Sequence, residues 1–116
     1  MGMFDDLEVS SKATVVPEDF RQRHYQTKDL DCDGSVYRID SANQFLKVEC
    51  PIGKPEKLLY AQNLNQDVGC YDFGYDFVLQ VRNGIVVGCE TGTSDADYWD
   101  GVEPIWMPFI ESESRG

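Results

Sequence analysis

The sequence predicts a mainly β protein, either a single compact antiparallel sheet or a small barrel-like domain with at most one short helix. Apolar residues alternate with polar ones in several short segments, which is the period of a half-buried strand. Gly, Pro, Asn and Asp separate these segments, and an Asn-Gly pair lies between two β-branched runs. The chain has 116 residues, of which 41% are hydrophobic and 12% aromatic. This is enough for one core, so we expect a single domain over 1–116 with a frayed tail at 111–116.

The central element is expected to be a hairpin around Asn83-Gly84, because this pair best tolerates the positive φ angles of a two-residue type I′ turn. The predicted cross-strand pairs are Val81 with Val86, Leu79 with Gly88, Arg82 with Ile85 and Val78 with Cys89. Both faces are mostly apolar, which predicts a hairpin in the middle of the fold, covered on each side.

Further strands are predicted on either side of turn-forming residues. Alternation favours strands over 35–40 and 45–50, separated by a loop at 41–43, and a third over 57–61 after the Pro51 to Pro55 break. Segments 7–9 and 13–16 are expected as edge strands. One short helix is predicted over 17–23, where Pro and acidic residues begin a segment of only two turns.

An alternation of aromatic residues with Asp or Gly occupies 71–77, and as one strand it would place four rings on one face. The acids Asp72 and Asp76 would then lie on the opposite face. The rings are expected either to belong to the core or to form a binding surface, since Tyr and Phe supply large contact area.

Segment 91–106 begins as a loop and mixes acids with large aromatic residues. Its acids are Asp95, Asp97, Asp100 and Glu103, and its rings are Tyr98, Trp99 and Trp106. Carboxylates pair with Arg, and rings offer cation–π contacts, so this composition suits a basic groove on another protein. The alternative is a surface loop whose Trp106 returns to the core.

The charge is large and unevenly distributed. The formal net charge is -11, and residues 58–116 hold ten acidic side chains against only Arg82 and Arg115. Such acidity argues against direct binding to nucleic acid, which needs Lys and Arg at phosphates. A negative patch formed by the second half would attract a basic surface; the alternative is a solvated face that keeps the protein soluble.

Segment 29–40 resembles an EF-hand calcium loop at Asp29, Asp31, Asp33 and Asp40, and at the Gly34 of the sharp turn. Two features do not fit an EF-hand. The last position of the loop is Asp40, whereas a Glu is needed there to bind calcium with both carboxylate oxygens, and residues 36–39 have the pattern of a strand. An acidic turn that leads into a strand is therefore the preferred interpretation. No cofactor is expected, with Ca²⁺ as the alternative.

The four cysteines stand far apart in sequence, at Cys32, Cys50, Cys70 and Cys89. Buried reduced thiols are the main expectation, because free Cys commonly serves as a small core residue and the chain shows no sign of export. Disulfides or a metal site formed by convergence in space remain as alternatives.

The sequence contains little that is typical of an enzyme active site. His24 is the only histidine, and the sequence contains no nucleophile elbow, P-loop or dinucleotide fingerprint. We therefore expect a protein that is not an enzyme. The start of the chain lacks a basic region followed by an apolar run, and no apolar run approaches the length of a membrane span. These features predict a soluble, intracellular protein that does not bind membranes.

Two motifs in the first third of the chain carry a resemblance. The start Met1-Gly2-Met3-Phe4-Asp5 is followed by a Gln-Thr-Lys-Asp-Leu-Asp-Cys segment at 26–32, just before the Tyr-containing segment 36–39. In both, the chain resembles a group of small uncharacterised proteins of tailed bacteriophages and prophages. The resemblance implies a phage gene product acting in a host bacterial cytoplasm. It also argues against a calcium loop, since the shared motif ends before Asp33-Gly34, which such a loop would need.

These observations together predict a phage accessory protein that binds and inhibits a host protein with a basic groove. The target is expected to be a nucleic-acid-handling or anti-CRISPR-type defence complex, whose groove would take the acids in place of phosphates. The expected partner-binding residues are Asp72, Asp76, Asp95, Asp97, Tyr98, Trp99, Asp100 and Glu103. The alternatives are a calcium-binding module at 29–40 and a small virion structural or assembly protein.

Overall fold

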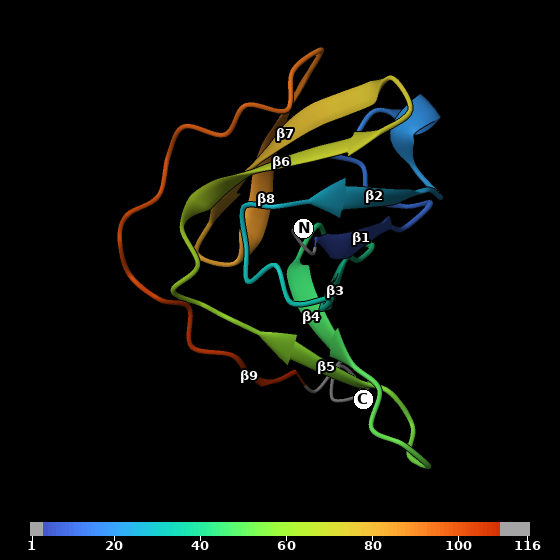
Figure 1. The fold of residues 1–116 in the computed structure, drawn as a ribbon, viewed down its shortest axis with the longest axis vertical. Helices are drawn as coiled ribbons and strands as arrows, with labels where there is room; N and C mark the ends of the chain where they lie inside the picture. The colour runs from blue at the N-terminus through green and yellow to red at the C-terminus, as the bar shows by residue number, and fades with distance from the viewer. Residues whose placement is uncertain (1–3, 110–116) are drawn as a thin grey trace.

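The computed structural model describes residues 4–109, and its strands form one curled mixed sheet, a half-barrel with almost no helix (Figure 1). The mainly β fold class is confirmed. The strands are β1 (Asp5–Val9), β2 (His24–Thr27), β3 (Val36–Ile39), β4 (Phe45–Glu49), β5 (Lys57–Tyr60), β6 (Gln66–Asp72), β7 (Tyr75–Arg82), β8 (Ile85–Thr91) and β9 (Met107–Pro108). The tail expected to fray, 111–116, and Met1 to Met3 of the shared motif lie outside the described residues. In the described part of the chain, no helix has the length and apolar character needed to cross a membrane.

The sheet has the strand order β8-β7-β6-β2-β1-β3-β4-β5-β9. All neighbouring pairs are antiparallel except β1 and β3, which run parallel with Leu7 opposite Tyr37. The antiparallel sheet that the sequence predicts as one of two architectures is therefore mixed at this one place. The parallel pair arises because β2 occupies one side of β1, so the chain crosses to the other side before it forms β3.

The Asn83-Gly84 turn is confirmed, with φ angles of 54° and 79°. The predicted pairs Val81–Val86 and Arg82–Ile85 are confirmed as well, but a bulge between Gln80 and Val81 shifts the rest of the register. Leu79 consequently lies opposite Cys89 and Val78 opposite Glu90, instead of Gly88 and Cys89.

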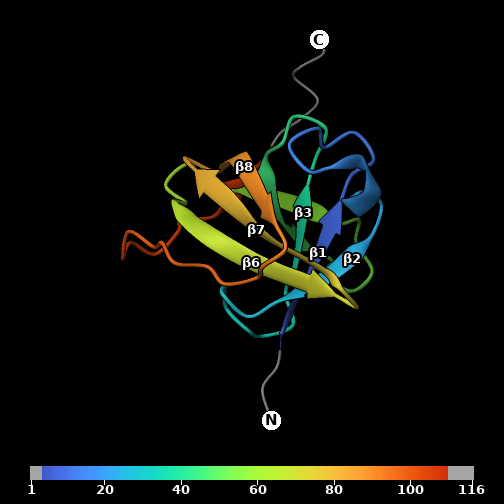
Figure 2. The ribbon, with the colours of Figure 1, turned by 90° about the horizontal axis from the view of Figure 1, so that it is seen from above.

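The predicted position of this hairpin in the middle of the fold is wrong, because β8 is the edge strand of the sheet. Its Val87 side chain is 58% exposed. The curl of the sheet nevertheless brings the hairpin tip back to β4, where the Phe45 amide donates to the Gly84 carbonyl at 2.9 Å. Seen from above, β6 and β7 cross obliquely over β1 and β3 (Figure 2).

The aromatic segment 71–77 forms a hairpin, not the single strand that its alternation predicts. Phe73 and Gly74 adopt φ angles of 41° and 92° and make the turn between β6 and β7. The four rings therefore do not share a face. Phe73 is 99% exposed at the turn, whereas Phe77 is fully buried and meets Tyr25 edge to face at 4.7 Å between ring centroids.

Among the shorter segments, the predicted strands 35–40, 45–50 and 57–61 are confirmed as β3, β4 and β5, and the short helix is a single 3-10 turn, Glu18–Phe20. The two expected edge strands are wrong. Segment 7–9 lies in β1 at the centre of the sheet, and 13–16 makes turns whose Ala13 and Val16 are buried. β2 and most of β6 were not predicted.

Candidate functional site

A pocket of about 330 Å³ opens between the β2–β3 connection and the long loop (residues 92–106) that follows β8. In Figure 1 this loop, drawn in orange, curves around the start of β6. We call this cavity the acidic pocket. Its carboxylates are Asp29, Asp31, Asp67, Asp97 and Glu103. Its aromatic rings are Tyr37, Tyr98, Trp99 and Trp106. The lining includes no Lys, Arg or His among the described residues.

The acidic pocket brings together two motifs that the sequence presents separately. Asp97, Tyr98, Trp99 and Glu103 come from the predicted partner-binding set, and they meet two acids of the calcium-like segment 29–40. Trp106, a ring of the predicted segment 91–106, also lines the pocket, whereas the sequence pattern does not mark Gln66 or Asp67 as part of a site. Asp67 and Gln66 belong to β6, which was not predicted, and only the fold places them beside the long loop.

Hydrogen bonds to β6 and to the β5–β6 turn hold the long loop in place. The Asp67 amide donates to the Tyr98 carbonyl at 2.8 Å. The Asn63 side chain donates to the Glu103 carbonyl at 3.0 Å and accepts from the Ile105 amide at 2.8 Å. These contacts fix the loop at Tyr98 and again at 103–105, although the segment has no regular structure.

Gly69 on β6 allows the loop to approach closely. A Cβ atom at this position would lie 1.9 Å from the Ser94 carbonyl oxygen. At the other end of the loop, Trp106 is partly buried and contacts Tyr37 at 5.8 Å between ring centroids. Trp106 thus returns to the core, as the alternative predicts, while Tyr98 and Trp99 stay 44% and 54% exposed.

The other predicted partner-binding acids lie apart from the pocket. Asp95 and Asp100 are exposed on the same loop but do not line the cavity. Asp72 and Asp76 flank the turn at the far end of the β6–β7 hairpin, and Asp72 pairs with Arg23 at 3.8 Å. Asp72 is six residues along β6 from Gln66, which corresponds to roughly 20 Å in a strand.

The calcium-like segment surrounds an anion instead of a cation. The fully buried carboxylate of Asp5 accepts four backbone N–H groups, from Cys32 at 2.8 Å and from 33–35 at 3.0 Å each. Inward-facing amides form a nest for negative charge. An EF-hand loop presents carboxylate and carbonyl oxygens to its centre, so this geometry is the opposite of the one predicted by the alternative interpretation.

The four acids of that segment serve separate partners. Asp29 accepts from the Gly69 amide at 2.7 Å, Asp31 lies 3.5 Å from Lys47, and Asp40 accepts from the Gln44 amide at 2.8 Å. The hydrogen bond from the Ser35 hydroxyl lowers the pKa of Asp33. Within residues 4–109, no three metal-ligating side chains are grouped to hold an ion.

Two cations of the chain itself flank the acidic pocket. The Arg82 guanidinium lies 4.5 Å from the Tyr98 ring centroid and 3.2 Å from Asp67. Lys47 lies 5.9 Å from the Trp106 ring centroid. Burial, reinforced by the nearby charge of Asp31, raises the pKa of Tyr37, so its hydroxyl stays protonated and donates to Asp31 at 3.2 Å.

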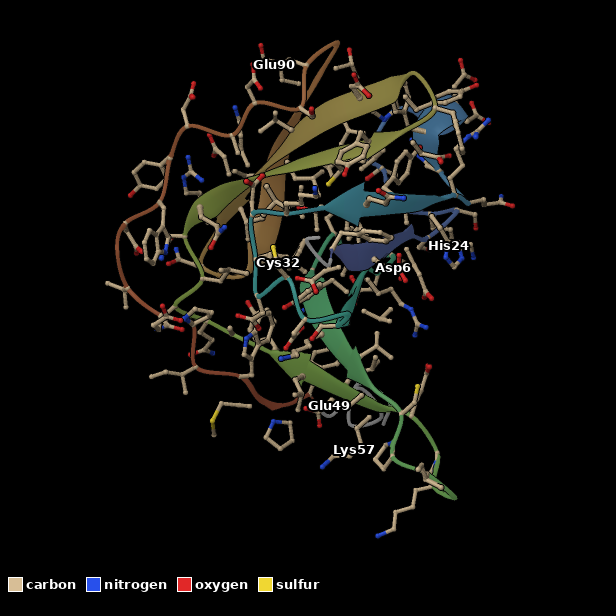
Figure 3. The ribbon with its side chains drawn as sticks, viewed as in Figure 1. Asp6, His24, Cys32, Glu49, Lys57 and Glu90 are labelled. Carbon is tan, nitrogen blue, oxygen red and sulfur yellow. The ribbon has the colours of Figure 1, made fainter. Side chains whose placement is uncertain are left out.

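The cysteines and the histidine lie outside the pocket lining. All four thiols are free; Cys70 is buried as expected, but Cys50 is exposed. Burial raises the pKa of Cys89 to about 11, which keeps it protonated at neutral pH. His24 begins β2 and lies across the molecule from the long loop (Figure 3).

The chemistry of the lining favours a positively charged ligand. Carboxylates supply charge and hydrogen-bond acceptors, and aromatic faces attract cations through their quadrupoles. Comparison with known proteins finds no family model, curated protein or solved structure that matches the chain.

Proposed function

We propose that this protein binds a basic surface of a partner protein through the acidic pocket and the adjoining long loop. The observation that carries the proposal is the convergence of five carboxylates and four aromatic rings, from three separate segments, on a cavity with no basic lining residue. Asp95 and Asp100 extend the same charge onto the exposed outside of the loop.

The consequence of such binding is competition with nucleic acid. A groove built for phosphates attracts carboxylates for the same electrostatic reason, and the net charge of -11 accelerates the encounter by steering. The resemblance of the first third to phage proteins supplies the setting: an accessory protein that inhibits a nucleic-acid-handling or defence complex of the bacterial host.

Affinity capture from bacterial lysate in rising salt tests the proposal. The test variant is the triple charge reversal D95K/D97K/D100K in the long loop. The matched control is E18K/D19K/E90K, which changes the net charge equally at exposed positions outside the pocket lining. Both are compared with the wild type for folding before capture.

We expect a basic protein that is captured by the wild type and by the control, released as salt rises, and lost with the loop variant. Added nucleic acid should displace the captured protein. A partner that is not basic, or one that the loop variant retains in full, would contradict the proposal.

A further inference from the structure

We propose that the acidic pocket binds one guanidinium group, the side chain of an arginine that the partner protein inserts. This inference rests on the proposed function and specifies its central contact. A cavity of about 330 Å³ is at the small end of ligand pockets, so it suits one side chain and not an extended segment.

The first argument is a buried acceptor in the lining. The Gln66 side chain is only 7% exposed, and its Nε2 donates to the Asp29 carbonyl at 3.0 Å. Its Oε1 accepts no hydrogen bond from the residues that the structure describes. Gln66 lines the pocket, and because a buried polar atom without a partner costs free energy, a bound donor that reaches this oxygen is favoured.

The second argument is that three of the five carboxylates in the pocket carry charge that no ion pair with a described residue compensates. Lys47 pairs with Asp31 and Arg82 with Asp67. Asp97 and Glu103 are in no ion pair with any described residue, and Asp29 meets only the neutral Gly69 amide. A neutral donor would leave these charges unmatched, whereas a cationic donor would pair with them.

The third argument concerns the choice between guanidinium and ammonium. Arg82 already shows how this surface holds a guanidinium, with Tyr98 under its plane and Asp67 at its edge. A ring and a carboxylate, those of Trp99 and Asp97, also line the pocket and are the same two kinds of group. A planar guanidinium can stack on a ring while its five donors reach acceptors at its edge, whereas an ammonium is a compact, strongly hydrated point charge.

The test uses blocked tripeptides as probes: acetyl-Gly-Arg-Gly-amide, the matched Lys peptide, and the citrulline peptide, which keeps the shape of Arg without its charge. Trp99 and Trp106 are the only tryptophans of the chain and both line the pocket, so indole fluorescence and NMR report binding there directly. We expect the Arg peptide to shift both indole signals, the Lys peptide to bind more weakly, and the citrulline peptide not to bind.

Variants localise the contact. Asp97→Asn should lower the affinity for the Arg peptide by about tenfold, which corresponds to the loss of one charge-assisted hydrogen bond. Asp19→Asn is the matched control on the exposed 3-10 turn and should leave the affinity unchanged. Free L-arginine, whose carboxylate the acidic lining repels, should bind less tightly than the blocked peptide; tighter binding would overturn the assignment to a partner's side chain.

Equal affinities for the Arg and Lys peptides, or indole signals that do not move, would overturn the inference. If basic partners were still captured and lost with D95K/D97K/D100K, the proposed function would stand without it. If the Arg peptide bound as expected but no basic partner were captured, the pocket would keep its assigned ligand and the proposed function would fall.

Discussion

The carboxylate of Asp5 accepts a hydrogen bond of 3.0 Å from the amide of Gly34, 29 positions later in the chain. Three neighbouring amides donate to the same side chain, which is fully buried. These bonds attach the β2–β3 connection to the first residue of β1, at the point where the chain crosses to form the parallel pair. The same connection supplies one wall of the acidic pocket.

Asp5→Ala should therefore destabilise the fold strongly. The substitution leaves several buried N–H groups without an acceptor, so we expect the free energy of unfolding to fall by about 3–5 kcal/mol. Denaturant unfolding measures this change. Asp6→Ala, at the next position of β1 (Figure 3), is the control and should cost about 0.5 kcal/mol. Similar losses in the two variants would contradict the role of Asp5.

Calcium should not stabilise the protein through segment 29–40, because its amides face the Asp5 carboxylate and its acids serve separate partners. We expect no binding heat and no change in melting temperature at millimolar Ca²⁺. Magnesium at the same ionic strength controls for screening of the net charge. A calcium-specific rise in melting temperature would restore the alternative interpretation.

Gly69→Ala should displace the long loop from β6, since the new Cβ meets the Ser94 backbone. We expect a loss of stability of about 1–3 kcal/mol and a change in tryptophan emission as the pocket distorts. Gly88→Ala on β8 is the matched control, because its Cβ meets only the flexible end of Gln80. Unaltered emission in Gly69→Ala would show that the loop does not depend on this close approach.

Gly84→Ala should cost more than Gly53→Ala, although both residues have positive φ angles, of 79° and 76°. Each substitution incurs the strain of a left-handed conformation, about 1–2 kcal/mol. At Gly84 the Cβ would also lie 2.5 Å from the Ala61 carbonyl oxygen, whereas at Gly53 nothing lies within 4 Å. Thermal unfolding of the two variants measures the additional cost of the contact with Ala61. Equal losses of stability in both variants would mean that the hairpin tip is not packed against Ala61.

Alkaline pH should destabilise the protein through Tyr25. Burial raises the pKa of Tyr25 to about 12 from its ordinary value of 10.0. Between these values the unfolded chain loses the phenol proton while the folded chain keeps it, so the free energy of unfolding falls as pH rises. Each pKa unit corresponds to about 1.4 kcal/mol, and because the folded phenol is itself half ionised at pH 12, the loss by that pH is at most about 2 kcal/mol.

Tyr25→Phe separates this effect from packing. At neutral pH the variant loses the hydrogen bond that the Tyr25 hydroxyl donates to the Phe20 carbonyl at 2.7 Å, at a cost of about 1 kcal/mol. Above pH 10 its stability should fall less steeply than that of the wild type. Denaturant unfolding from pH 8 to 12 measures both slopes, and parallel slopes would exclude Tyr25 as the source.

The local sequence pattern was sufficient to predict an element wherever a few neighbouring residues determine the backbone conformation. Asn83-Gly84 specified its turn because these residues tolerate positive φ, and the alternation in 36–39 and 45–49 specified two strands. The same logic failed at 71–77. There an alternation that fits one strand is interrupted by a turn at Phe73-Gly74, which lets β6 and β7 pair over their whole length.

The candidate site was predictable in its components but not in its assembly. Composition alone marked Asp97, Tyr98, Trp99 and Glu103 as a segment suited to cations. The partners Asp29, Asp31 and Asp67 became part of the same cavity only through the sheet, which places β6 beside both loops. The bulge that shifts the β7–β8 register and the nest around Asp5 likewise depend on contacts between residues distant in the chain. Strand period and turn chemistry act over a few residues, whereas the order of strands in a sheet is set by which surfaces bury one another.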